Sequence, residues 1–213
     1  MDFLPPKIEK YALENSSSET DLLAELNRET NLKILSPRML SGHLQGRVLS
    51  MISHMIQPSL ILEIGTYTGY SAICLAEGLT ENGKLITIDN NEELTPVLNK
   101  FLNKSPKSNQ IEVLIGDATK LIADLPNNID LVFIDADKEN YSLYFDLVIE
   151  KMRQGGFILA DNVLWSGKVV EPIKMNDRST LEIDAFNKKI QNDSRVENVL
   201  LPIRDGIMLI RKK

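Results

Sequence analysis

The 213-residue sequence is poor in several residue types, and each shortage excludes a class of protein. Its single cysteine, Cys74, cannot form an internal disulfide, which fits a cytoplasmic location. The formal net charge of −6 argues against nucleic acid as the main partner. No run of about 18 apolar residues is present, so we expect no membrane-spanning helix. Residues 1–6 lack a basic stretch followed by an apolar segment, so we expect no signal peptide.

The overall composition of the chain is that of an ordinary folded domain. Hydrophobic residues make up 43% of the chain and charged residues 25%, and the length suffices for one core, so we expect a single domain over residues 1–213. Residues 1–58 have a helical pattern. Ser18 or Thr20 can cap one helix, and a second covers residues 39–56 and ends at Pro58. We expect residues 1–58 to form a helical cap on an α/β core over residues 59–213.

From residue 60 onward, short apolar runs alternate with helical segments. This alternation predicts an α/β fold with a mostly parallel sheet and helices on both faces. The expected strands are 60–64, 84–88, 111–115, 131–134, 157–160, 196–201 and 207–211, and the expected helices are 69–79, 92–102, 118–125, 141–152 and 181–190. The last two strands flank a turn, so the last strand should be antiparallel. Residues 165–179 are expected to form a long loop of the kind that often carries function.

Two acidic clusters directly follow apolar strands. Asp135-Ala136-Asp137-Lys138 follows the strand over 131–134, and Asp161-Asn162 follows the strand over 157–160. Ligands of open α/β sheets bind at the carboxyl ends of the strands. Carboxylate and amide oxygens suit Mg²⁺, Mn²⁺ or Ca²⁺ rather than Zn²⁺. These residues can therefore bind a divalent cation, or they can simply cap helices and solvate loops.

The turn after the first strand is rich in glycine. Residues 63–71 read Glu-Ile-Gly-Thr-Tyr-Thr-Gly-Tyr-Ser. A dinucleotide fingerprint would require glycine at 65, 67 and 70, but Tyr67 and Tyr70 stand at the last two positions. The spacing suits a ligand with an adenosyl group and an amino-acid tail but no phosphate. The alternative is an ordinary tight turn.

Two further strand ends have side chains suited to an adenosine. Asp89 can accept hydrogen bonds from both ribose hydroxyls, or it can cap the next helix. Gly116-Asp117-Ala118 follows the third strand. The small Ala118 leaves room for an adenine ring and Asp117 can accept from its amino group, or the segment is only a turn before a helix.

Together these segments resemble the class I S-adenosylmethionine-dependent O-methyltransferases, in particular the cation-dependent family that includes caffeoyl-CoA and catechol O-methyltransferases. The resemblance extends from about residue 36 to the carboxyl terminus. It rests on three segments in order, residues 63–71, 133–141 and 155–167, and residues 201–206 (Leu-Pro-Ile-Arg-Asp-Gly) are also similar to the family's final turn.

The resemblance implies a Rossmann-like fold and an enzyme that uses S-adenosylmethionine, Mg²⁺ (or Mn²⁺ or Ca²⁺) and a small phenolic acceptor. Asp135, Asp161 and Asn162 match the metal ligands. Lys138 matches the proposed general base, and Asp135 lies in both the catalytic and donor regions. From the resemblance and the strand ends together, we expect the donor site to comprise Met39, Ser41, Glu63, Gly65, Thr66, Ser71, Asp89, Gly116, Asp117, Ala118, Asp135 and Asp137.

The acceptor is less well defined by the sequence. Trp165 either lines the acceptor pocket or anchors its loop, and His43 lies in the segment expected to close over donor and acceptor. Ser166 stands where the plant caffeoyl-CoA enzymes carry asparagine, and Leu44-Gln45 replaces their acidic pair. This pattern is more similar to bacterial members. We expect a catechol-type acceptor, with a caffeoyl-CoA-like ester as the alternative.

Two other classes of function compete with this one. An adenosine-cofactor oxidoreductase is disfavoured by Tyr67 and Tyr70. A non-catalytic module that binds S-adenosylmethionine would have no need of Asp135, Asp161 and Asn162. The amino-terminal helices have more apolar positions than a short cap requires. Together with the precedent of the resembled enzymes, this predicts a homodimer, unless all of these positions pack on the chain's own sheet.

Overall fold

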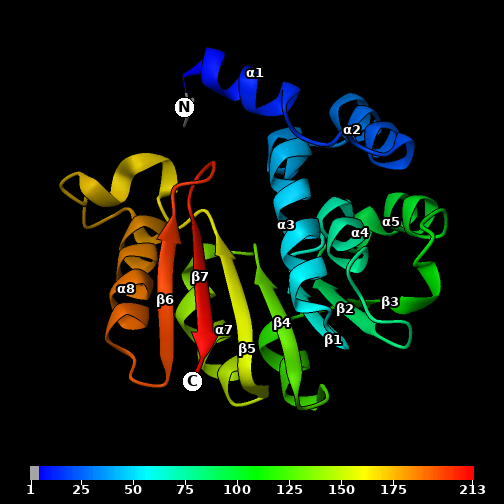
Figure 1. Cartoon of the computed structure of the whole chain (residues 1–213). Coiled ribbons are helices and arrows are strands. Elements are labelled where there is room, and N and C mark those ends of the chain that lie inside the picture. The colour runs from blue at the N-terminus through cyan, green and yellow to red at the C-terminus, as the bar shows by residue number, and fades with distance from the viewer. Residues whose placement is uncertain (1–4) are drawn as a thin grey trace.

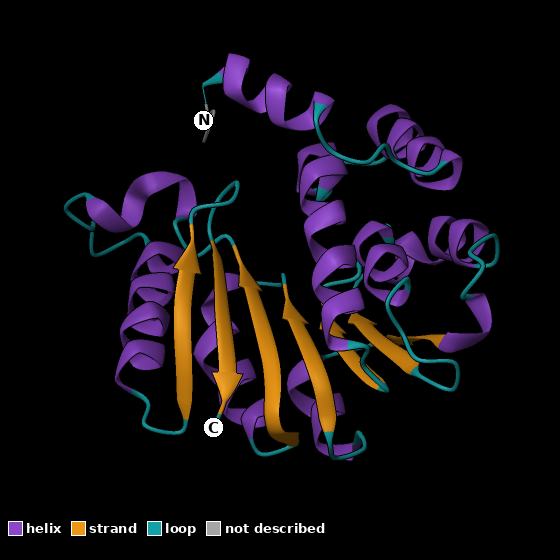
Figure 2. Cartoon of the chain, viewed as in Figure 1, coloured by secondary structure: helices purple, strands orange, loops and turns teal. Residues whose placement is uncertain are grey.

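The computed structural model describes residues 5–213, which form a seven-stranded sheet flanked by helices (Figures 1 and 2). The strands are β1 (Leu60–Ile64), β2 (Lys84–Asp89), β3 (Ile111–Ile115), β4 (Ile129–Ile134), β5 (Met152–Asp161), β6 (Val196–Leu201) and β7 (Ile207–Lys212). The α-helices are α1 (Pro6–Glu14), α2 (Asp21–Lys33), α3 (Gly42–Ile56), α4 (Tyr70–Ala76), α5 (Thr95–Leu102), α6 (Ala118–Leu121), α7 (Tyr141–Ile149) and α8 (Arg178–Asn192). Short 3-10 helices include η1 (Pro37–Met39), η2 (Glu92–Leu94), η5 (Lys138–Asn140) and η6 (Trp165–Val170).

The strand order is β3-β2-β1-β4-β5-β7-β6, and β7 runs antiparallel to both of its neighbours. The predicted mostly parallel Rossmann-like sheet with an antiparallel last strand is therefore confirmed. The chain lays down β1, β2 and β3 outward in one direction and then returns to place β4 on the other side of β1. In open α/β sheets such a reversal opens a crevice at the carboxyl ends of the two strands, where ligands bind.

Alternation along the strands divides the core into two layers. Ile61, Leu131 and Phe133 pack with α2, α3, α4 and α5, whereas their neighbours Val132 and Ile134 pack with α7 and α8. Successive side chains of a strand point to opposite faces, so apolar runs such as 131–134 bury both faces at once. This burial explains why the central strands could be recognised from the sequence.

Element boundaries differ from the expected ones mainly where the ends are polar. The helix expected over 39–56 begins at Gly42, because residues 37–39 form η1. The helix expected over 141–152 ends at Ile149, and β5 already begins at Met152. The polar residues at the start of β5 contribute no apolar signal. Thr20 caps α2 as expected, since its hydroxyl accepts a hydrogen bond from the Leu23 amide.

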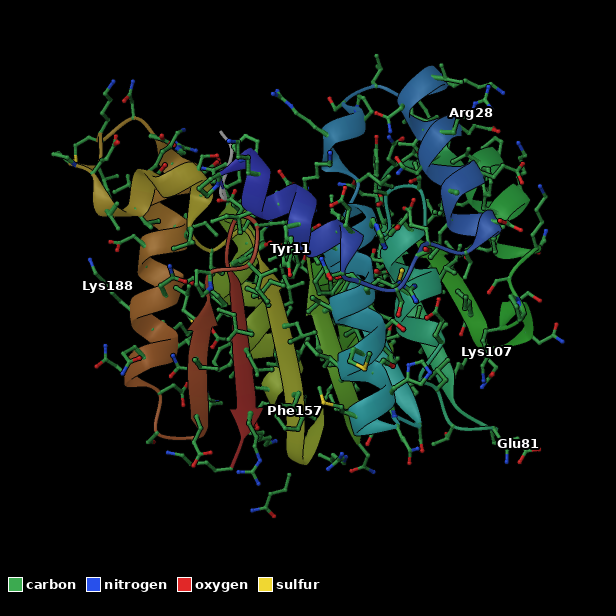
Figure 3. All side chains as sticks on the ribbon, turned by 45° about the horizontal axis from the view of Figure 1, so that its top comes forward. Tyr11, Arg28, Glu81, Lys107, Phe157 and Lys188 are labelled. Carbon is green, nitrogen blue, oxygen red and sulfur yellow. The ribbon has the colours of Figure 1, made fainter. Side chains whose placement is uncertain are left out.

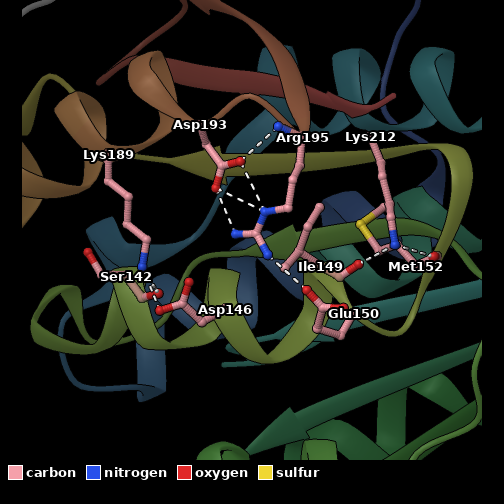
Figure 4. A network of polar contacts seen from close by, with 9 residues as sticks. All are labelled: Ser142, Asp146, Ile149, Glu150, Met152, Lys189, Asp193, Arg195 and Lys212. Carbon is pink, nitrogen blue, oxygen red and sulfur yellow. Dashed lines mark hydrogen bonds and ion pairs between the residues drawn. The ribbon is translucent and has the colours of Figure 1, made fainter.

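A polar network joins α7 to α8 and to the loop between α8 and β6 (Figure 4). Lys189 of α8 pairs with Asp146 of α7 at 2.5 Å. Arg195 bridges Asp193 and Glu150 at 2.7 and 2.8 Å. These contacts hold the two helices together on the face of the sheet that they share.

Within residues 5–213, no helix has the length and apolar character needed to cross a bilayer. Charged side chains such as Arg28 and Lys188 point away from the body of the molecule (Figure 3). Residues 1–4, on which the expectation of no signal peptide partly rests, lie outside the described residues.

Candidate active site

One large cleft lies at the carboxyl ends of the parallel strands. It runs from the turn after β1, past the ends of β2 and β3, to the ends of β4 and β5 and the start of η6. Its volume of about 1970 Å³ exceeds that of an ordinary small-ligand pocket and leaves room for two ligands side by side. The segment around Ser41 lines the cleft from the helical cap, so the site is built from both parts of the chain.

The glycine turn brings the ends of β1 and β4 into close contact. Gly65 adopts a left-handed backbone with φ of 100°, and a Cβ atom there would lie only 2.1 Å from the carbonyl oxygen of Asp135. Glycine is therefore required at this position. Tyr67, also left-handed, donates its backbone N–H to Asp89 Oδ2 at 2.7 Å, which holds the turn against the end of β2.

Asp89 and Asp117 both line the cleft, but each is already engaged by backbone groups. Asp89 Oδ1 accepts from the Asn91 amide at 2.9 Å. Asp117 caps α6, because its Oδ1 accepts from the Thr119 amide and hydroxyl at 3.0 and 2.6 Å. These hydrogen bonds from Thr119 hold the pKa of Asp117 below its usual value. Asp117 thus lies in the turn before α6, as its alternative interpretation expected, in a position that still faces the cleft.

Glu63 lies beneath the cleft rather than in its wall. It is completely buried, and its Oε2 accepts a 2.5 Å hydrogen bond from the Thr87 hydroxyl. The Thr66 hydroxyl lies 2.5 Å from that of Thr87, so a chain of hydroxyls links Glu63 to the cleft. Burial raises the pKa of Glu63 to about 8, because the charged form is poorly solvated. Among the described residues, Oε1 has no hydrogen-bond partner. A neutral carboxyl fits these surroundings.

Asp135 and Asp161 lie next to each other because their strands are neighbours. Ile134 of β4 pairs with Ala160 of β5, so the next residues, Asp135 just after β4 and Asp161 at the end of β5, lie side by side. Asp161 is 1% exposed, and its burial and the charge of Asp135 raise its pKa well above the usual range. Its Oδ1 accepts from the Asn162 amide at 2.7 Å, and Oδ2 accepts from Gln45 Nε2 at 2.6 Å. Asn162, with φ of 60°, completes the predicted ligand set on the wall of the same cleft.

No group of three or more His, Cys, Asp or Glu side chains within residues 5–213 converges to hold a metal. The predicted set has only two carboxylates, and its third member is the amide of Asn162. Its oxygen atoms are the donors that Mg²⁺, Mn²⁺ and Ca²⁺ prefer.

Lys138 is held beside Asp135 in a fixed position. Its Nζ lies 3.1 Å from Asp135 Oδ1 and donates to the Tyr141 hydroxyl at 2.6 Å. Tyr141 is completely buried, and its hydroxyl donates to the carbonyl oxygen of Asp161 at 3.0 Å. The Lys138 ammonium also lies 5.9 Å from the centroid of the Trp165 ring. Lys138 is therefore surrounded by groups that limit its motion.

The wall of the cleft that follows β5 is formed by an unusual backbone segment. Trp165, Ser166 and Gly167 are all left-handed, with φ of 49°, 57° and 78°. Such a run is strained for residues other than glycine, and surrounding contacts must hold it. Asp205 does so by accepting from the Ser166 amide at 2.6 Å. The segment expected to be a long loop thus begins with η6, which is kinked because its first residues have non-helical dihedral angles.

Of the predicted site residues, the structure brings all but two to the wall of the one cleft. Those on the wall are Met39, Ser41, Gly65, Thr66, Ser71, Asp89, Gly116, Asp117, Ala118, Asp135, Asp137, Lys138, Asp161, Asn162, Trp165 and Ser166. Glu63 is buried below it, as described. His43 also lies outside it, where its Nε2 contacts the carbonyl oxygen of Ser17 at 2.6 Å. The expectation that His43 faces the acceptor receives no support from this position, since the ring is directed to the amino-terminal segment instead.

Several residues that support the site were not predicted from the sequence, and Gln45 and Arg204 are two of them. Gln45, completely buried in α3, contacts Asp161, and Arg204 contacts Gln45 from the turn between β6 and β7. No local pattern marks either of them. The only signal was the position of Arg204 in a segment similar to the family's final turn.

The sheet and cleft define a Rossmann-like methyltransferase fold. A solved structure of an O-methyltransferase from Bacillus cereus in complex with SAH shares it, with a TM-score of 0.89, 27% sequence identity and 97% of each chain covered. Residues 13–213 match the sequence profile described as O-methyltransferase, and the chain belongs to this family of enzymes.

Curated relatives agree with this assignment. The chain is 34% identical over 207 residues to a probable caffeoyl-CoA O-methyltransferase 2 of Dictyostelium discoideum, with 95% of this chain and 90% of that protein covered. It is 33% identical over 216 residues to caffeoyl-CoA O-methyltransferase 5 of Nicotiana tabacum, with 95% and 90% covered. The expected family is therefore confirmed.

The buried carboxyl of Glu63 predicts a specific pH dependence of stability. The native protein keeps the Glu63 proton up to about pH 8, whereas the unfolded chain loses it near its ordinary pKa of 4.5. Between these values the native state binds more protons, so its stability falls as the pH rises. From about pH 5 to about pH 8, we expect the wild-type free energy of unfolding to fall by roughly 4 kcal/mol relative to that of Glu63→Gln.

Urea unfolding of both proteins at a series of pH values measures this difference. Glu81→Gln, the same change at an exposed position, controls for the loss of one carboxyl group. Parallel stability curves for the wild type and Glu63→Gln would show that Glu63 is charged in the native state and contradict the prediction.

Proposed function

We propose that this enzyme transfers the methyl group of S-adenosylmethionine to one hydroxyl of a vicinal dihydroxy aromatic and requires a divalent cation to do so. The observation that carries the proposal is the convergence of Asp135 and Asp161 in the cleft that also contains the glycine turn. This arrangement supplies a cation-binding edge next to a place for an adenosyl ligand.

The donor is supported by the glycine turn and by the B. cereus structure, which holds SAH. Because Gly65 has no side chain, the backbone of the turn lies close to that of Asp135. Asp89 and Ala118 line the part of the cleft where the ribose and adenine would lie. A sulfonium donor has no phosphate, which fits a turn that carries tyrosine at position 67. No comparable observation supports the alternative that this chain is an oxidoreductase with an adenosine cofactor.

The residues present fit a divalent cation. Two carboxylates and one amide offer three oxygen ligands, and about three positions of an octahedron would stay open for acceptor oxygens and water. Each oxygen of Asp161 accepts one hydrogen bond and keeps further lone pairs. A cation here would offset the repulsion between the two acids. When bound, it would lower the pKa of a phenol and fix both oxygens of a catechol.

Lys138 is the candidate general base for the acceptor hydroxyl. It lies on the cleft wall within 3.1 Å of Asp135, so an acceptor near Asp135 would also be near Nζ. Tyr141 and Trp165 restrict the side chain to this position. The base role requires Lys138 in its neutral form, from which it can take the proton of the phenol.

A second candidate acceptor is a caffeoyl-CoA-like ester. The names of the Dictyostelium and tobacco relatives favour it. Ser166 and the absence of an acidic pair at 44–45 favour a smaller catechol instead. A homodimer in the cytoplasm remains a further proposal, based on the apolar positions of the amino-terminal helices, among which Met51 and Met55 of α3 are exposed.

The metal requirement is tested by chelation. We expect EDTA to abolish methylation of 3,4-dihydroxybenzoate by the purified enzyme and Mg²⁺ to restore it, because the acceptor must share the cation with Asp135 and Asp161. Transfer of a tritiated methyl group measures the activity, with caffeoyl-CoA and a monohydroxy analogue assayed in parallel. Asp161→Asn should lose at least about 100-fold in turnover, while Asp124→Asn on the surface should match the wild type. Full activity in EDTA would rule out the cation.

The role of Lys138 is tested separately. We expect Lys138→Ala to lower kcat by about 100-fold or more, since general base catalysis typically contributes at least that much. The dissociation constant for S-adenosylhomocysteine, measured by calorimetry, should change less than about threefold, because no donor contact is removed. Lys168→Ala is the control, since Lys168 also lies 6.0 Å from the centroid of the Trp165 ring. Equal losses in turnover and donor affinity would argue against a base.

A further inference from the structure

Gln45 connects the helical cap to the end of β5 through both ends of its side-chain amide. The side chain is completely buried. Its Nε2 donates to Asp161 Oδ2 at 2.6 Å, and its Oε1 accepts from Arg204 Nη1 at 2.5 Å. Only this orientation of the amide is possible, because the reverse would place the amide oxygen against a carboxylate and its NH₂ against a guanidinium.

The contact from Gln45 completes the orientation of the Asp161 carboxylate. Its two oxygens accept from donors on different elements, Oδ1 from the Asn162 amide and Oδ2 from α3. A carboxylate held at both oxygens cannot rotate about its χ2 angle without losing one of these bonds. Its remaining lone pairs are therefore aimed in fixed directions.

Arg204 extends the connection to a third part of the chain. The same Nη1 that donates to Gln45 also donates to the carbonyl oxygen of Ser41, in the segment that lines the cleft from the cap. Arg204 has a left-handed backbone with φ of 48°, between the ends of β6 and β7. A non-glycine residue adopts this conformation only where its surroundings hold it. Segments more than 100 residues apart in sequence thus meet at one amide.

We propose that Gln45 and Arg204 are positioning residues for the metal site. Arg204 holds the Gln45 amide, and Gln45 in turn sets the orientation of Asp161 toward the cation. This inference rests on the proposed function, since it assumes that Asp161 is a metal ligand. It extends that proposal by making metal affinity depend on two residues that do not themselves bind the metal.

The variant Gln45→Met tests the contact to Asp161. Methionine has a similar length but donates no hydrogen bond, so the carboxylate would lose one of its two fixed donors. We expect the dissociation constant for Mn²⁺ alone to rise at least about 10-fold, as for other groups that orient metal ligands. The electron paramagnetic resonance signal of free Mn²⁺ measures this without any turnover. Gln154→Met is the matched control, because Gln154 is exposed near the opposite end of β5.

A double-mutant cycle tests whether Arg204 acts through Gln45. Arg204→Met should weaken Mn²⁺ binding several-fold in the wild-type background and have no further effect in the Gln45→Met background, since the contact it supports is already gone. Additive losses, or unchanged Mn²⁺ affinity in both single variants, would contradict the proposal that Arg204 acts on the metal site through Gln45. Should Gln45→Met not fold, Arg204→Met still tests it, because Arg204 is only partly buried.

The outcome for the wild type separates this inference from the proposed function. Stoichiometric Mn²⁺ binding by the wild type that is lost in Asp135→Asn would support the metal site. Unchanged binding in Gln45→Met would then overturn only the positioning role of Gln45 and Arg204. A wild type that binds no Mn²⁺ would overturn both proposals.

Discussion

The structure of the site depends on the adjacency of β4 and β5. Because these parallel strands are in register at Ile134 and Ala160, the acids that follow them are forced together at the edge of the sheet. Two like charges in a largely buried position repel, and the protein surrounds them with hydrogen-bond donors. Lys138 contacts Asp135, and the Asn162 amide and Gln45 contact Asp161. The two acids concentrate negative charge at one place, and a divalent cation can neutralise it.

The same sheet places the donor region beside these acids. The reversal of strand order between β1 and β4 opens the crevice, and the missing side chain of Gly65 lets the backbone at Asp135 approach the turn after β1. Asp135 therefore stands at the junction of the glycine turn and the acidic pair. A methyl group must pass in line from sulfur to oxygen over a short distance, so this junction is the natural place for the transfer.

Residues whose role follows from a strand end were predictable from the sequence. Asp89, Asp135 and Asp161 each follow an apolar run, and parallel strands bring their carboxyl ends to one edge, so their convergence could be anticipated. Gly65 was recognisable for a similar local reason. The burial of Glu63 below the cleft was not, because it depends on which face of β1 the side chain takes and on the hydroxyl of Thr87 in the next strand.

Contacts between segments far apart in the chain could not be predicted from the sequence. Gln45 is an unremarkable polar residue in an amphipathic helix, and only the docking of α3 against the end of β5 brings it to Asp161. His43 lies two residues earlier, and the helical rotation between them directs it away from the cleft. The start of α3 at Gly42 also differs from the expected one, since residues 37–39 form η1 after the left-handed Ser36.

The most direct test of the account is a crystal structure with Mn²⁺ and S-adenosylhomocysteine bound, using anomalous scattering to locate the metal. We expect one strong anomalous peak at about 2.0–2.3 Å from oxygens of Asp135, Asp161 and Asn162, with the sulfur of the bound product facing the remaining open positions of the metal. A peak elsewhere, or no peak between these three side chains at saturating Mn²⁺, would contradict the central claim that the two strand ends form a cation site.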